Sequence, residues 1–136
     1  TFTSPIYNDY GIYLNETKGW IFQNGFNKGD IIFVIGADDV EVGDVIIFNG
    51  GESYPIIHRV IGIESEEGEK IYSTKGDNYI TNYYQLDGRG SSVDETSIRE
   101  DEVIGEALFK VPWIGWAKLI FYEPFKNEDK RGLCGQ

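Results

Sequence analysis

The apolar residues of this chain come in short runs, and a glycine-aspartate pair opens each of the first two. Gly29-Asp30 precedes the run Ile31–Ile35, and Gly43-Asp44 precedes the run Val45–Phe48. A turn signal followed by a short, mainly β-branched segment is typical of a β-strand. Because both runs are apolar throughout and do not alternate with polar residues, we expect strands that are buried on both faces or lie inside a barrel.

A third strand is predicted over residues 54–64. Side chains alternate along a strand, so His58 lies on one face and Arg59 on the other. The polar turn Glu66-Glu67-Gly68-Glu69 has the length of a hairpin connection. Residues 70–74 are therefore expected to return as the antiparallel partner of the third strand.

The remaining segments complete an all-β domain built from hairpins. Val103–Val111 is the last well-marked strand, and residues 117–125 are expected as a strand or an amphipathic turn. The polar stretch 78–102 is expected as a long loop insertion. The predicted organisation has three parts: an irregular N-terminal segment over residues 1–28, a β core over 29–125 and a charged tail over 126–136.

Charge and composition exclude several classes of function. The net charge is −11, from 23 acidic and 12 basic residues, and no basic cluster is present. A nucleic-acid-binding protein needs a basic face to displace counterions from phosphates, so we expect no nucleic-acid partner. The chain contains no run of about 18 apolar residues, so no transmembrane helix is predicted. Cys134 is the only cysteine, which excludes an internal disulfide and a zinc cluster, so we expect no metal.

His58, the only histidine, is the first candidate for catalytic chemistry. Imidazole has a reference pKa of about 6.5 and therefore suits a general base. A partly buried structural histidine is the competing interpretation. Asp77 follows the hairpin partner of the His58 strand, so the hairpin can bring its carboxylate beside the imidazole and hold the imidazole tautomer. A turn-capping aspartate in Gly76-Asp77-Asn78 is the structural alternative.

Four segments, taken in order, resemble type I signal peptidases of the archaeal and endoplasmic-reticulum kind. The segments are Lys28-Gly29-Asp30, Val42-Gly43-Asp44-Val45-Ile46-Ile47-Phe48, Pro55-Ile56-Ile57-His58-Arg59-Val60-Ile61 and Thr74-Lys75-Gly76-Asp77-Asn78. Val103-Ile104-Gly105 and Pro112-Trp113-Ile114-Gly115 resemble the closing segment of the family. The resemblance covers residues 28–118, about two thirds of the chain.

The resemblance implies a coiled, partly open β-barrel that acts as a serine endopeptidase and removes signal peptides from secreted and membrane preproteins. No metal or organic cofactor is implied. The substrate would bind as an extended strand. A membrane anchor would precede Thr1 and hold the catalytic domain on the extracytoplasmic or lumenal face. Aromatic residues between Trp113 and Phe125 would then suit either the membrane interface or ordinary core packing.

In the family that this chain resembles, a serine attacks the scissile carbonyl, a histidine is the general base and an aspartate follows a lysine-glycine-aspartate motif. His58 and Asp77 match this pattern. A second family aspartate lies a few residues further on, where this chain has Tyr83 and then Asp87. Asp77 and Asp87 are therefore both candidates for the residue that orients His58.

The nucleophile is the point at which the chain departs from the family pattern. Without an insertion, the family serine would fall at Ile21, which carries no nucleophilic group. An insertion over residues 5–25 would make Ser4, the only serine before Gly29, the nucleophile. The alternative is that the serine has been lost or cut away, which would leave an inactive or truncated peptide-binding domain.

Overall fold

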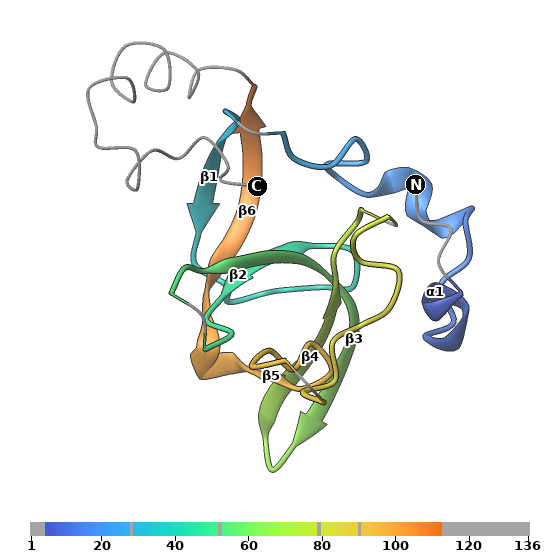
Figure 1. Ribbon diagram of the computed structural model, residues 1–136, viewed down its shortest axis with the longest axis vertical. Helices are drawn as coiled ribbons and strands as arrows, with labels where there is room; N and C mark the ends of the chain where they lie inside the picture. The colour runs from blue at the N-terminus through green and yellow to red at the C-terminus, as the bar shows by residue number, and fades with distance from the viewer. Residues whose placement is uncertain (1–4, 28, 52, 79, 90, 113–136) are drawn as a thin grey trace.

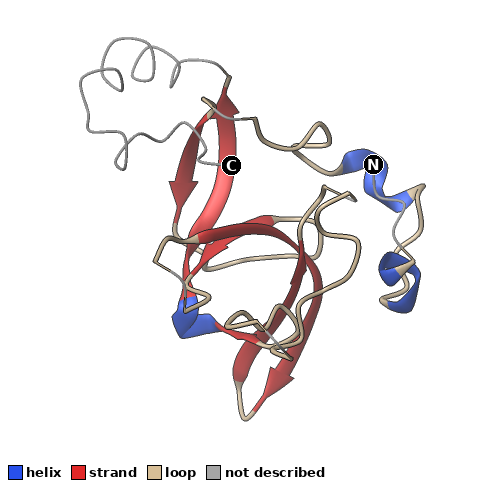
Figure 2. Ribbon diagram, in the orientation of Figure 1, coloured by secondary structure: helices blue, strands red, loops and turns tan. Residues whose placement is uncertain are grey.

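The computed structural model describes residues 5–27, 29–51, 53–78, 80–89 and 91–112. These residues form a six-stranded antiparallel sheet, in the order β1-β6-β2-β3-β4-β5, with little helix (Figure 1; Figure 2). The strands are β1 (Ile31–Ile35), β2 (Val45–Phe48), β3 (Ile56–Glu66), β4 (Glu69–Lys75), β5 (Ile98–Arg99) and β6 (Val103–Val111). Within the described ranges the two end strands, β1 and β5, do not pair, so the sheet is not closed. The prediction of an all-β, partly open fold is confirmed.

The β3–β4 hairpin forms as the sequence predicts. Glu66 of β3 pairs with Glu69 of β4, which leaves Glu67 and Gly68 as a two-residue turn. Both turn residues have positive φ, 52° and 92° respectively. This is the backbone of the tight hairpin turns that match strand twist.

The loop predicted over residues 78–102 contains more regular structure than expected. Its last part forms β5, in which Arg99 pairs with Ile71 and Ile98 pairs with Tyr72. A short 3-10 helix, η2 (Glu100–Glu102), then leads into β6. The predicted segment 117–125, the predicted tail 126–136 and Ser4 lie outside the described residues.

The prediction that both early strands are buried on two faces is right for β2 and wrong for β1. β2 lies between β3 and β6, and Ile46 and Phe48 on one face and Val45 on the other are at most 1% exposed. Among the described residues β1 pairs only with β6, and Phe33 and Val34 are 47% and 46% exposed. In Figure 1, β1 and the end of β6 form a ribbon that stands away from the curved part of the sheet. An apolar run is buried only if other elements cover it, and the sequence of one strand does not contain that information.

Two apolar clusters lie on opposite sides of β3, as the predicted alternation requires. Val60 packs with residues of β2 and β4 in the larger cluster. Ile61 packs with Tyr7 and Ile12 in the smaller one. The N-terminal residues, which include the helix α1 (Ile6–Asp9) and the 3-10 helix η1 (Glu16–Gly19), therefore cover one face of β3.

The two glycine-aspartate pairs are structural turns. Gly29 and Gly43 have φ values of 95° and 107°, in the region that favours glycine. Asp30 accepts the backbone N–H of residue 27 at 2.9 Å, and Asp44 accepts the N–H of residue 41 at 2.8 Å. Both aspartates therefore bind nearby backbone N–H groups, as aspartates in turns commonly do.

Candidate active site

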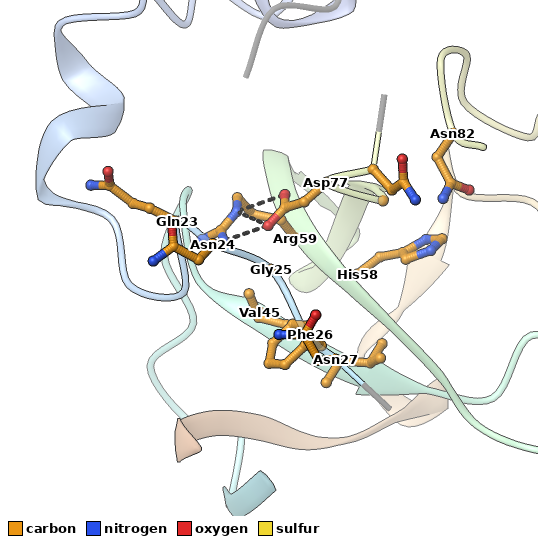
Figure 3. A pocket seen from close by; sticks show the side chains of 13 residues that line it. Gln23, Asn24, Gly25, Phe26, Asn27, Val45, His58, Arg59, Asp77 and Asn82 are labelled. Atoms are coloured by element: carbon orange, nitrogen blue, oxygen red, sulfur yellow. Dashed lines mark hydrogen bonds and ion pairs between the residues drawn. The ribbon is translucent and has the colours of Figure 1, made fainter. Parts of the chain in front are cut away.

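An open cavity of about 620 Å³ lies beside the start of β3, where the segment before β1 meets the end of β4 (Figure 3). Its lining combines polar and charged side chains with apolar ones and draws on four separate parts of the chain. The lining residues are Gln23, Asn24, Gly25, Phe26, Asn27, Val45, Ile57, His58, Arg59, Gly76, Asp77, Asn78 and Asn82. His58 and Asp77, two of the residues predicted from the sequence, therefore lie in one cavity.

His58 is held by the sheet on both sides of β3. It pairs with Ile46 of β2, and its neighbour Arg59 pairs with Lys75 of β4. The imidazole lies edge-on to Phe48, with ring centroids 6.4 Å apart, and the side chain is 17% exposed. The ring is thus packed against the larger apolar cluster while one part of it reaches the cavity.

A buried glutamate lies against the imidazole. Nδ1 of His58 contacts Oε1 of Glu95, whose side chain is 0% exposed. Within the described residues neither atom has another hydrogen-bonding partner. A proton on Nδ1 would satisfy both atoms and leave Nε2 unprotonated, as a general base requires. The other carboxylate oxygen of Glu95 accepts the backbone N–H of Leu86 at 2.8 Å.

The backbone around Glu95 explains how a residue from the long loop reaches His58. Glu95 donates its N–H to the carbonyl of Leu86 at 2.7 Å and accepts the N–H of Thr74 at 2.8 Å. The loop therefore folds back on itself and runs beside the end of β4. Sequence reasoning missed Glu95 because it placed the polar stretch 78–102 in a loop insertion. No pattern in the sequence marks Glu95, and its burial becomes visible only in the structure.

Asp77 contacts Arg59 in place of His58. The guanidinium donates from Nε to Oδ1 at 2.9 Å and from Nη2 to Oδ2 at 2.6 Å. It also donates to the carbonyl of Gly43 at 2.5 Å and lies over the ring of Trp20, 5.3 Å from the centroid. The Arg59 side chain is 0% exposed, so Asp77 is the counterion of a buried cation.

The other predicted site residues lie elsewhere. Asp87 accepts the backbone N–H of Arg89 at 3.1 Å, and its side chain is 49% exposed. Ser4 lies outside the described residues. Ile21, the position of the family serine without an insertion, is 40% exposed and lies two residues before the cavity-lining segment that begins at Gln23.

Lys75 ties the two ends of the cavity loop together. Its Nζ donates to the carbonyl of Gly76 at 2.9 Å and to that of Asn82 at 2.5 Å. The same nitrogen lies 5.4 Å from the centroid of the Tyr7 ring. Burial lowers the pKa of Lys75, while Asp77 and Glu95 act in the opposite direction. The residue is a structural cation whose contacts hold the loop from Gly76 to Asn82.

A histidine that contacts a buried carboxylate at the edge of an open cavity has the geometry that a general base needs. Sequence comparison finds similar proteins of one kind. The chain is 28% identical to the signal peptidase complex catalytic subunit sec11 of Talaromyces marneffei, over 83% of this chain and 68% of that protein. It is 29% identical to the protein of the same name from Yarrowia lipolytica, over 83% of this chain and 64% of that protein.

A third relative, the sec11 subunit of Sclerotinia sclerotiorum, is 26% identical over 83% of this chain and 66% of its own length. The chain thus spans about two thirds of the length of the curated relatives that it matches. No protein-family model matches it. The resemblance to type I signal peptidases found in the sequence is confirmed, because these relatives are all named as signal peptidase catalytic subunits.

Two features are absent from the described residues. No helix in them is both long enough and apolar enough to cross a membrane. No three histidine, cysteine, aspartate or glutamate side chains in these ranges lie together as a metal site would require.

Proposed function

We propose that this domain is a signal-peptidase-type serine endopeptidase in which His58 is the general base. The observation that carries the proposal is the contact of His58 with fully buried Glu95 at the edge of an open cavity, in a chain related to signal peptidase catalytic subunits. Glu95, rather than Asp77 or Asp87, is the carboxylate that orients the imidazole.

In the proposed reaction, Nε2 of His58 removes the proton of a serine hydroxyl while the serine oxygen forms a bond to the scissile carbonyl carbon. The carbonyl electron pair moves onto its oxygen, and the resulting imidazolium is stabilised by Glu95. Collapse of the intermediate breaks the C–N bond, and Nε2 returns the proton to the leaving amine. Water then repeats the sequence on the acyl-enzyme and releases the serine.

Ser4 is the proposed nucleophile. Tyr7, three residues further on, packs against Ile61 of β3, and its ring lies near Nζ of Lys75. Lys75 directly precedes Gly76, which lines the cavity. The chain therefore leaves Pro5 from a point beside the strands that carry the site, which supports a short path from Ser4 to His58.

The proposed substrates are preproteins that carry a signal peptide, bound as an extended strand with alternate side chains directed into the cavity. The relatives are named as subunits of a signal peptidase complex. By analogy, we propose that this domain acts at a membrane, through an anchor that precedes Thr1, on the extracytoplasmic or lumenal face.

The test is cleavage of a signal-peptide-bearing preprotein, with the cut located by mass spectrometry. Ser4→Ala should abolish cleavage without changing the melting temperature, and His58→Ala should abolish cleavage in a chain that still unfolds cooperatively. Ser65→Ala, at an exposed position of β3, should cleave normally. Normal cleavage by His58→Ala would refute the general-base role. Normal cleavage by Ser4→Ala would refute Ser4 as the nucleophile. A wild-type chain that binds the preprotein but leaves it intact would establish the peptide-binding alternative.

A further inference from the structure

The side-chain amide of Asn82 lies next to the reactive edge of His58. A methyl group added at Gly76 would lie 2.7 Å from Nδ2 of Asn82 and 2.8 Å from Nε2 of His58. The two nitrogens therefore approach the same point above the Gly76 backbone, and only a glycine leaves that point open. In Figure 3, Asn82 lies at the same end of the cavity as His58, with its amide nitrogen on the side of the imidazole.

Asn82 is held in place through its backbone, which leaves its side chain available. Its carbonyl accepts Nζ of Lys75 at 2.5 Å, and its N–H donates to the carbonyl of Asn78 at 2.7 Å. Nδ2 donates to Oγ1 of Thr81 at 3.0 Å, which accounts for one of its two hydrogens. The side chain therefore keeps one donor for a bound molecule, at a site where the backbone does not depend on the side chain.

We propose that the carboxamide of Asn82 donates a hydrogen bond to the scissile carbonyl oxygen and stabilises the oxyanion that forms there. This inference rests on the proposed function. Nε2 of His58 takes a proton from the nucleophile, so the attacked carbonyl must lie within a few ångströms of Nε2. A donor beside Nε2 is positioned for the oxygen on which negative charge develops. An uncharged amide also avoids repulsion with the imidazolium that forms in the same step.

The experiment compares steady-state cleavage of a signal-peptide-bearing preprotein by the wild-type chain, Asn82→Ala and Asn82→Asp. The aspartate variant has nearly the same shape but replaces the donor by a charged acceptor. We expect kcat to fall about 10²- to 10³-fold in both variants, the loss typical of removing one oxyanion donor. KM and the melting temperature should change little, because the backbone contacts of Asn82 remain.

Thr81→Ala is the matched control, since it removes the side-chain partner of Nδ2 and leaves the donor. It should cleave within a few-fold of the wild-type rate. A wild-type kcat in Asn82→Ala, together with loss of activity in His58→Ala, would overturn the role of Asn82 and leave the proposed function standing. A fall in kcat that follows a fall in melting temperature would also overturn it, because the residue would then be structural. A wild-type chain that does not cleave would overturn both proposals.

Discussion

The Arg59–Asp77 pair offers a quantitative test of how the site is held. Asp77→Ala removes the carboxylate from a guanidinium that is 0% exposed and leaves it with the carbonyl of Gly43 and the ring of Trp20. Breaking a buried ion pair by removing one partner typically costs about 3–5 kcal/mol, because the remaining charge stays buried. The Asp77 side chain is 16% exposed, so water can reach the vacated space, and we expect the lower end, about 3 kcal/mol.

A loss of this size is a large part of the free energy of unfolding of one domain, which is typically about 5–15 kcal/mol. For a chain of this length it corresponds to a fall in melting temperature of about 10 °C. Urea and thermal unfolding, followed by tryptophan fluorescence, measure it directly. Asp39→Ala, at an exposed position, is the control and should unfold as the wild type does.

The double variant Arg59→Met/Asp77→Leu tests whether the lost stability comes from the unpaired charge of Arg59 or from the loss of the side chain at position 77. Replacement of a buried ion pair by apolar residues of similar size is often neutral, so the double variant should recover most of the stability that Asp77→Ala loses. If Asp77→Ala unfolds at the wild-type temperature and yet cleaves poorly, the reasoning is refuted. Asp77 would then act on the chemistry, as its match to the family motif first suggested, and not on the buried cation.

Three further predictions concern the same part of the fold. Glu95→Gln should lower kcat about 10²- to 10⁴-fold, as loss of the orienting carboxylate does in hydrolases of this kind, in a chain that still melts cooperatively. Gly76→Ala should lower kcat because the added methyl group overlaps Nε2 of His58, and the His58 ring resonances in an NMR spectrum should shift. Glu106→Gln should raise the free energy of unfolding at pH 7 by about 0.5 kcal/mol. Burial is the main cause that raises the pKa of Glu106 above 4.5, and the negative charges of Asp44 and Glu41 raise it further. Its charged form therefore costs stability as the pH rises through the folded-state pKa. Urea midpoints should show this gain at pH 7 and lose it below about pH 4, where the carboxyl is protonated in both states.

The sequence predicted those turns and strands that depend on only a few neighbouring residues. The turns at Gly29-Asp30 and Gly43-Asp44 and the hairpin at Gly68 need a particular backbone conformation, and their residues supply it. The burial of Ile31–Ile35 could not be predicted in the same way. It depends on how many strands lie beside a given strand, and within the described ranges β1 lies beside β6 alone.

The candidate site was predictable to a similar extent. The hairpin brings His58 and Asp77 into one cavity, but the carboxylate that the sequence places beside the imidazole contacts Arg59. The contact partner of each residue could not be predicted. His58 and Arg59 are adjacent in β3, and either side chain can bind a carboxylate. The contact with Glu95 depends on the return of the loop beside Thr74, which rests on backbone hydrogen bonds that no residue pattern marks.

The two carboxylates at this site have different tasks, and the chemistry of their partners explains why one could not serve both. A guanidinium is charged at every accessible pH, so Arg59 needs a permanent counterion once it is buried. Asp77 already uses both oxygens for that purpose. An imidazole that acts as a base is charged only for part of the reaction, and its partner must remain at Nδ1 throughout. The proposed mechanism therefore assigns that place to a second carboxylate, Glu95. Glu95 meets the requirement because Leu86 holds its other oxygen and because its burial keeps water from competing for Nδ1.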